Sequence, residues 1–122
     1  MAQGGFDDAE VLAKLSEDIG AEDDLATQVM WRSARARILA ARGEAPGAES
    51  LAREALALAE LTDDVNMRAD TLVDLGEVLR AAGRAVDAAD AFTSALELYV
   101  AKGNIVGAED ARQRLASLDA PV

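Results

Sequence analysis

The stretch "LGEVLRAAGRAVDAADAF", residues 75–92, decides how this sequence folds. It is rich in alanine and leucine, which favour the α-helix. Glycine commonly marks the end of a helix. The stretch therefore predicts two helices that fold back on each other at Gly83. Its small residues, Gly76 and Ala88 among them, predict that the two helix axes approach closely, because a small residue at a crossing point lets neighbouring helices come together.

The composition of the chain excludes several classes of site. The 122 residues, enough for one domain, include no Cys and no His, so disulfides, thiolate–zinc sites, Cys nucleophiles and imidazole bases are ruled out. The net charge of −11 without a basic patch argues against binding to nucleic acid or to an anionic membrane. The start "MAQGGFDD" resembles no signal peptide, and no apolar run is long enough to cross a bilayer. We expect a cytoplasmic protein.

Apolar residues recur at helical spacing along nearly the whole chain, and no segment alternates as a strand does. The sequence therefore predicts an all-α fold. Caps and breaks divide it: Gly20, Gly43, Gly83 and Gly103 end helices, while the stretch "TDD" at 62–64 and Asn104 offer caps for the helices that follow. About six antiparallel helices are expected, at 7–19, 23–42, 45–61, 65–82, 85–102 and 104–118, with a flexible leader at 1–6 and a tail at 119–122.

The sequence contains an internal repeat with a period of 40 residues. Under that shift "RILAARGEAPGAESLAREALALAE" falls on "EVLRAAGRAVDAADAFTSALELYV", so that Leu39 matches Leu79 and Ala48 matches Ala88. Two helix–turn–helix units, 23–61 and 65–102, are therefore expected to stack within a single domain at 7–118. The helices at 7–19 and 104–118 would cap the ends of this short solenoid, as repeat proteins require.

The second unit resembles the tetratricopeptide repeat. The matching residues, at the spacing of that family, are Leu72, Leu75, Gly76, Leu79, Ala88, Phe92 and Ala95. The first unit keeps Ala36, Leu39, Ala48 and Ala55, but has Arg32 and Arg35 at two apolar positions and Ala52 in place of the aromatic residue. Val100 stands where the family has its final proline. The resemblance implies antiparallel helix–turn–helix repeats that form a right-handed solenoid.

A narrower resemblance covers residues 23–118. This segment is similar to the repeat region at the C-terminal end of bacterial signalling proteins that carry a nucleotide-cyclase domain or a signal-transduction ATPase. The chain has no GxxxxGK[ST] loop and is too short for a cyclase domain. The resemblance implies a fragment or a relative of such a regulator, acting as a non-catalytic scaffold that binds a protein, a peptide or another domain of its parent.

The family resemblance also implies a groove lined by the first helix of each pair. Its positions in this chain are Met30, Ser33, Arg37 and Ala40 in the first unit, and Asp70, Val73, Glu77 and Arg80 in the second. One subclass of the family clamps a peptide carboxylate with Asn and Lys. Ala34 and Asp74 stand at its Asn positions here, which argues against that activity.

The remaining candidate residues have structural and functional interpretations. Trp31 is read as a half-buried packing residue, with a pocket for a small effector near it as the alternative. Arg32, Arg35 and Arg42 share one stripe, read as a solvated face paired with the acidic first helix, or as a site for a partner's carboxylate or phosphate. Carboxylate pairs such as Asp87 and Asp90 are read as solvated. We expect no catalytic residue, metal or cofactor, and a possible homodimer.

Overall fold

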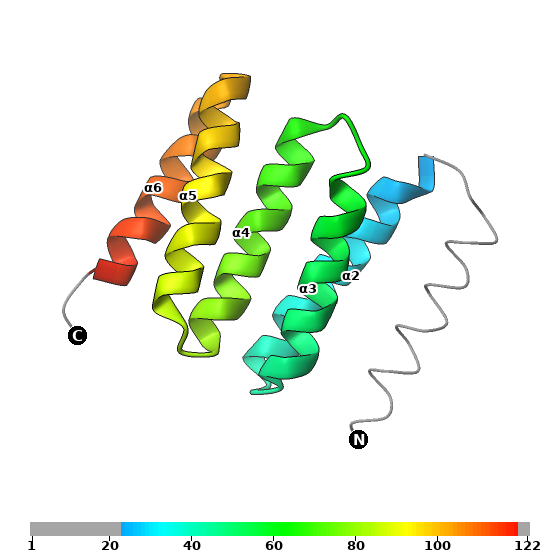
Figure 1. Cartoon of the computed structure of the whole chain (residues 1–122), viewed down its shortest axis with the longest axis vertical. Helices are drawn as coiled ribbons and strands as arrows, with labels where there is room; N and C mark the ends of the chain where they lie inside the picture. Colours follow the sequence, from blue (N-terminus) through cyan, green and yellow to red (C-terminus); the bar gives the residue numbers. More distant parts are fainter. Residues whose placement is uncertain (1–22, 120–122) are drawn as a thin grey trace.

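The computed structural model of the chain describes residues 23–119, which form five helices (Figure 1). They are α2 (Asp23–Ala41), α3 (Ala45–Ala59), α4 (Val65–Ala81), α5 (Ala85–Lys102) and α6 (Ile105–Asp119). The all-α prediction is confirmed. The leader at 1–6 and the helix expected at 7–19 lie outside the described residues, and so does most of the tail, although α6 extends to residue 119.

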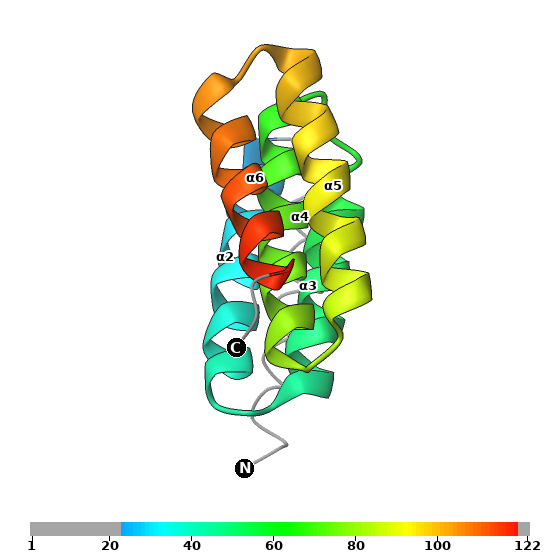
Figure 2. The ribbon, with the colours of Figure 1, turned by 90° about the vertical axis from the view of Figure 1, so that its left-hand side faces the viewer.

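The helices are arranged as a stack of antiparallel pairs. Consecutive helices lie side by side, and the tightest contacts are those of α2 with α3 and of α4 with α5. Figure 2 shows α2 and α6 on one side of the molecule and α3 and α5 on the other, with α4 between them. Because α2 also packs against α4, the first helices of the two pairs form one continuous face.

Short turns set this antiparallel order. Gly43, Gly83 and Gly103 each have φ near +80°, a left-handed conformation that glycine adopts without steric cost at the end of a helix. The Asp64 carboxylate accepts a hydrogen bond from the Met67 amide at 3.0 Å, and the Asn104 side chain accepts one from the Gly107 amide at 2.9 Å. Both predicted caps are therefore confirmed.

The core is built largely from small side chains. Ala36, Ala48, Ala88 and Ala95 are fully buried, and Phe92 is the largest side chain that is completely enclosed. One cluster of buried residues runs from α2 to α6, with Leu115 and Leu118 packed against it. The alanines of the sequence therefore serve packing, since they bring the paired helices close enough to bury the few large side chains between them.

Candidate binding site

The first helices of the two pairs, α2 and α4, enclose a pocket of about 500 Å³. This volume lies within the usual range for ligand pockets. The residues that line it come from α2, from α4 and from the cap of α4: Val29, Met30, Ser33, Ala34, Arg37, Asp64, Asn66, Met67, Asp70, Thr71 and Asp74. Four of the eight predicted groove residues, namely Met30, Ser33, Arg37 and Asp70, are therefore brought together here.

An ion pair crosses the pocket between its two helices. Arg37 of α2 donates a hydrogen bond to the Asp74 carboxylate of α4 at 2.7 Å. Burial raises the pKa of Asp74, while Arg37 and the nearby Ser33 hydroxyl act in the opposite direction. The negative charge of Asp70, one helical turn away, raises that pKa further. The two carboxylates therefore repel each other, and Arg37 compensates for only one of them.

The side chain of Asp70 is positioned by a hydrogen bond from a residue of α5. The Tyr99 hydroxyl donates a hydrogen bond to the Asp70 carboxylate, and the Tyr99 ring is buried in the core. Burial first, and then the neighbouring carboxylate, raises the pKa of Tyr99 above its ordinary value, so the phenol stays neutral and continues to donate. Sequence reasoning did not identify this role of Tyr99. Nothing in the local pattern links it to a residue 29 positions earlier.

The other four predicted residues lie outside this pocket, and Ala40 packs against the main core. Val73 is buried in the main core, so its side chain packs between helices. Glu77 is almost enclosed, with ion pairs to Arg80 and to Arg114 of α6. Arg80 also donates a hydrogen bond to the Ser117 hydroxyl at 2.9 Å. The part of this face between α4 and α6 is thus occupied by the chain's own ion pairs.

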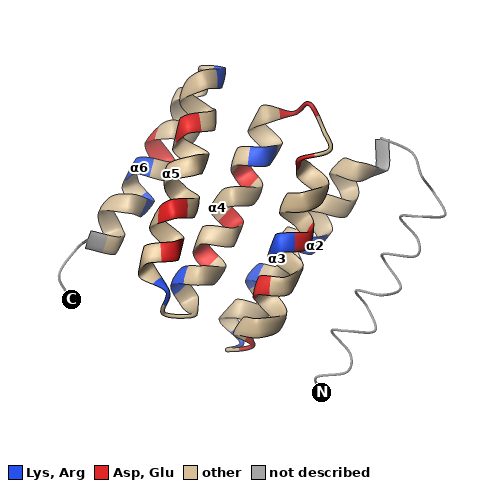
Figure 3. Cartoon of the chain, in the orientation of Figure 1, with Lys and Arg blue, Asp and Glu red and all other residues tan. Residues whose placement is uncertain are grey.

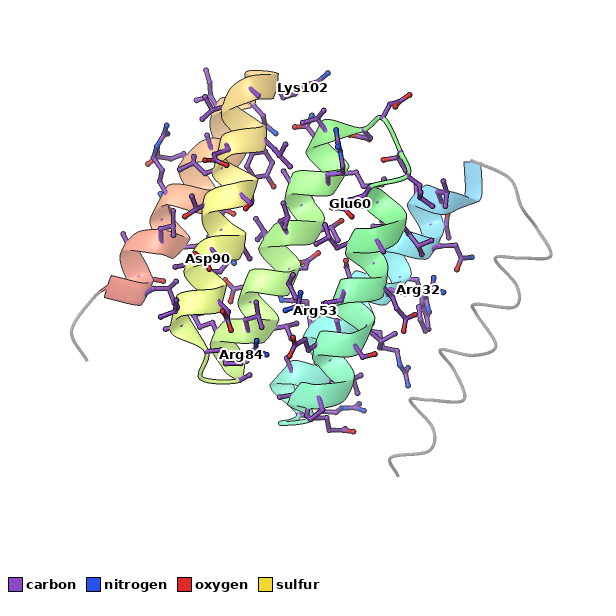
Figure 4. All side chains as sticks on the ribbon, in the orientation of Figure 1. Arg32, Arg53, Glu60, Arg84, Asp90 and Lys102 are labelled. Atoms are coloured by element: carbon purple, nitrogen blue, oxygen red, sulfur yellow. The ribbon has the colours of Figure 1, made fainter. Side chains whose placement is uncertain are left out.

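The basic residues of α2 do not form the solvated stripe that the sequence predicts. Arg32 has an exposed fraction of 2%, and its guanidinium donates to the Gln28 side chain at 2.9 Å and to Glu54 of α3 at 3.3 Å (Figure 4). For Arg32 the prediction is wrong, because α3 covers the position and Glu54 supplies the counter-charge. Arg35 lies over the ring of Trp31, 5.9 Å from its centroid.

Trp31 itself is half-buried and packs against the main core. This confirms the packing interpretation of that residue. Trp31 is not among the residues that line the pocket between α2 and α4. The pocket therefore lies on a different side of α2 from the position where an effector site was considered.

A second, smaller hollow of about 290 Å³ lies on the opposite side of the molecule, between α3 and α5. Its floor is formed by Leu72, Leu75 and Leu79 of α4, and Arg53 and Asp90 lie at its edges (Figure 4). Nearby, Arg84 reaches back to Glu49 of α3 at 2.5 Å. This second hollow is more open than the first, and charged residues of α3 and α5 line it together with the leucines.

Charged residues of both signs lie on α3, α4, α5 and α6 (Figure 3). Among residues 23–119 no cluster of acidic side chains has the arrangement of a metal site. Asp87, part of the carboxylate pair noted in the sequence, binds Arg84, and Asp110 binds Arg114. Within the described part of the chain, no helix is both long and apolar enough to cross a membrane.

The helix pairs, their stacking and the small-residue contacts between them are those of a known repeat. The family model described as tetratricopeptide repeat matches residues 26–99. The chain belongs to the tetratricopeptide repeat family. Comparison with curated proteins and with solved structures gave no match. Tetratricopeptide repeats generally mediate protein–protein interaction, and in the repeat described here the pocket between α2 and α4 lies on the face made by the first helices.

Proposed function

We propose that this chain is a non-catalytic interaction module that binds an extended segment of a protein partner, or of another domain of its parent, between α2 and α4. The observation that carries the proposal is the pocket of about 500 Å³ between these helices. A module of this kind needs an open site at a fixed distance between two rigid helices, since preorganised surfaces bind with less loss of entropy.

Two features of the pocket support this proposal. Met30 is 65% exposed at its rim, and a flexible methionine on a surface adapts readily to a partner's apolar side chain. The equivalent region between α4 and α6 is filled by the ion pairs of Glu77. A partner segment would therefore enter next to α2, where the polar groups of the groove are not all used internally.

We also propose that the module serves a bacterial signalling or transcriptional regulator in the cytoplasm. The support is the resemblance of residues 23–118 to the repeat regions of nucleotide-cyclase and ATPase regulators. In that setting the occupant of the pocket would be a segment of another domain or of a second protein. We also propose that the chain can associate into a homodimer. Light scattering that gives a constant mass of 12.7 kDa at all concentrations would exclude the homodimer.

Selection from a library of displayed peptides on the immobilised chain tests the site. We expect enriched peptides whose binding is strongly weakened by Met30→Ala, which removes the apolar contact without adding a charge. The matched control is Val86→Ala, which truncates a residue 77% exposed on α5, outside the pocket, and should leave binding unchanged. Equal loss in both variants, or in neither, would place the interaction elsewhere and contradict the proposal.

An effector-sensing domain with its pocket beside Trp31 is the alternative function. The pocket between α2 and α4 gives it no support, because Trp31 does not line that pocket. Trp31 fluorescence distinguishes the two functions. A saturable change on addition of a nucleotide or small metabolite, with no change on addition of selected peptides, would favour the sensor.

A further inference from the structure

We infer that the pocket between α2 and α4 recognises a basic side chain, lysine or arginine, of the partner segment. This inference rests on the proposed function, because it specifies the chemistry of the segment that the module binds. It is carried by three observations on the described residues: the charge of the pocket, a buried hydroxyl that makes no hydrogen bond, and an apolar wall beside them.

The charge of the pocket is negative overall. Asp64, Asp70 and Asp74 line it, and Arg37 is the basic residue among its lining. Arg37 is paired with Asp74, and Asp64 caps α4 through the Met67 amide. Among the basic residues that the structure describes, none forms an ion pair with Asp70, and its described hydrogen bond comes from the neutral Tyr99 phenol. The pocket therefore offers one carboxylate that is fixed in position and not neutralised.

Like charges one helical turn apart destabilise a helix, and Asp70 and Asp74 have this spacing on α4. A cation between them would relieve that repulsion. Each carboxylate also has unused capacity, because an ionised carboxylate accepts up to about four hydrogen bonds. Asp70 accepts one from Tyr99 through one oxygen, and Asp74 accepts the Arg37 guanidinium through one oxygen.

Ser33 supplies the second, independent observation. Its exposed fraction is 5%, and its hydroxyl lines the pocket without a hydrogen-bond partner in the structure. It lies near enough to Asp74 to lower the pKa of that carboxyl, but at no ordinary hydrogen-bond geometry. A buried polar group without a partner is costly. An ammonium or guanidinium group in the pocket would give the hydroxyl a donor.

An apolar wall completes the site. Val29, Met30, Ala34 and Met67 line the same pocket, and the aliphatic stems of lysine and arginine bury readily against such surfaces. A partner's glutamate or aspartate would instead meet Asp70 and Asp74 with no free basic group to receive it. The arrangement is thus the electrostatic reverse of a carboxylate clamp, since Asp74 stands at one of the clamp's Asn positions.

Titration of the full chain with four blocked tripeptides tests the inference. Their central residue is lysine, arginine, norleucine or glutamate, and amide shifts in the NMR spectrum report the site. We expect the lysine and arginine peptides to shift the amides of Ser33, Ala34 and Asp70 saturably. The norleucine and glutamate peptides should bind at least about tenfold more weakly, as expected for loss of one charge-assisted hydrogen bond.

The variant Asp70→Asn removes the charge but keeps an acceptor for Tyr99. We expect it to weaken binding of the lysine peptide about tenfold. The matched control Asp90→Asn makes the same change at an exposed residue of α5, outside the pocket, and should change binding less than about twofold. Circular dichroism of both variants checks that the helices are intact.

Failure of this inference can be told apart from failure of the proposed function. The charge inference is overturned if norleucine or glutamate peptides bind as tightly as the lysine peptide at the same amides. It is also overturned if the lysine peptide binds nowhere in the pocket while binding of the library peptides still depends on Met30. In both cases the module remains a peptide binder. If library peptides show no dependence on Met30, the proposed function fails, and with it the partner-segment interpretation of any lysine binding.

Discussion

Gly76 of α4 lies directly against the ring of Phe92 of α5. A Cβ atom added at Gly76 would come closer than 3.0 Å to three atoms of that ring. Phe92 is fully buried, so its ring has no free space into which it could move. The Phe92 ring therefore occupies the space that a side chain at Gly76 would need.

The variant Gly76→Ala tests this contact. Alanine would improve helix propensity by about 1 kcal/mol, but overpacking of a full core costs about 1–3 kcal/mol. We expect a net loss of stability of up to about 2 kcal/mol in urea unfolding. The double variant Gly76→Ala with Phe92→Leu should lose less than the sum of the single changes, because the smaller side chain makes room for the methyl group.

Gly47 of α3 is the matched control for Gly76. A Cβ atom there would meet only Leu39, at an ordinary 3.8 Å. Gly47→Ala should therefore leave stability unchanged or raise it by up to about 1 kcal/mol. Equal destabilisation at both glycines would mean that the Gly76–Phe92 contact is not what limits packing.

Tyr99 should resist ionisation in the folded protein. Its pKa is raised by burial and by Asp70, whereas an unfolded tyrosine titrates at about pH 10. The stability that this difference contributes is fully present below about pH 10 and is lost as the pH rises through the folded pKa. Because the chain has one tyrosine, tyrosinate absorbance reports it alone. We expect ionisation to occur well above pH 10, together with unfolding.

The variant Asp70→Asn isolates the contribution of the carboxylate to the pKa of Tyr99. It keeps the phenol buried but removes the neighbouring charge, so the pKa of Tyr99 should fall toward its ordinary value without reaching it. A wild-type tyrosine that titrates near pH 10 while the helices remain folded would contradict the contact between Tyr99 and Asp70.

Arg32 should be replaceable by an apolar residue of similar length. Arg32→Ala removes the buried stem and the hydrogen bonds to Gln28, with an expected loss of about 2–3 kcal/mol. Arg32→Met keeps the packing, and Glu54, whose side chain is 43% exposed, can be hydrated once its partner is gone. We expect a loss below about 1 kcal/mol for Met in urea unfolding. Equal losses of stability in the two variants would show that the charge of Arg32 contributes more than the packing of its aliphatic stem.

Glu49 should make the stability depend on pH in acid. Its hydrogen bond with Arg53, together with the charge of Arg84, lowers its pKa. A lowered folded-state pKa contributes stability that is present above the unfolded pKa and is lost as the pH falls through the folded pKa. The stability difference between wild type and Glu49→Gln should therefore be below about 1 kcal/mol at neutral pH and vanish as the pH falls below the folded-state pKa of Glu49. A difference that persists in acid would exclude the ion pairs as its cause.

The sequence predicted the helices well because their ends depend on local chemistry. Gly83, Asp64 and Asn104 act within a few residues of their own positions, and the 40-residue repeat marked which helices pair. The polar contacts between pairs could not be predicted in this way. Glu77 is enclosed because Arg114 arrives from 37 positions later, and Asp70 is positioned by Tyr99. Both depend on how the pairs stack, which no local pattern specifies.

The ion pairs and hydrogen bonds between the first helices also make the stacking of the helices sensitive to salt. Arg37 with Asp74, Arg80 with Ser117 and Arg114 with Glu77 each join residues 37 positions apart. Contacts between long charged side chains exchange and weaken with salt more readily than packed apolar ones. The stacking of these helices should therefore loosen as the ionic strength rises, while the helix content stays constant.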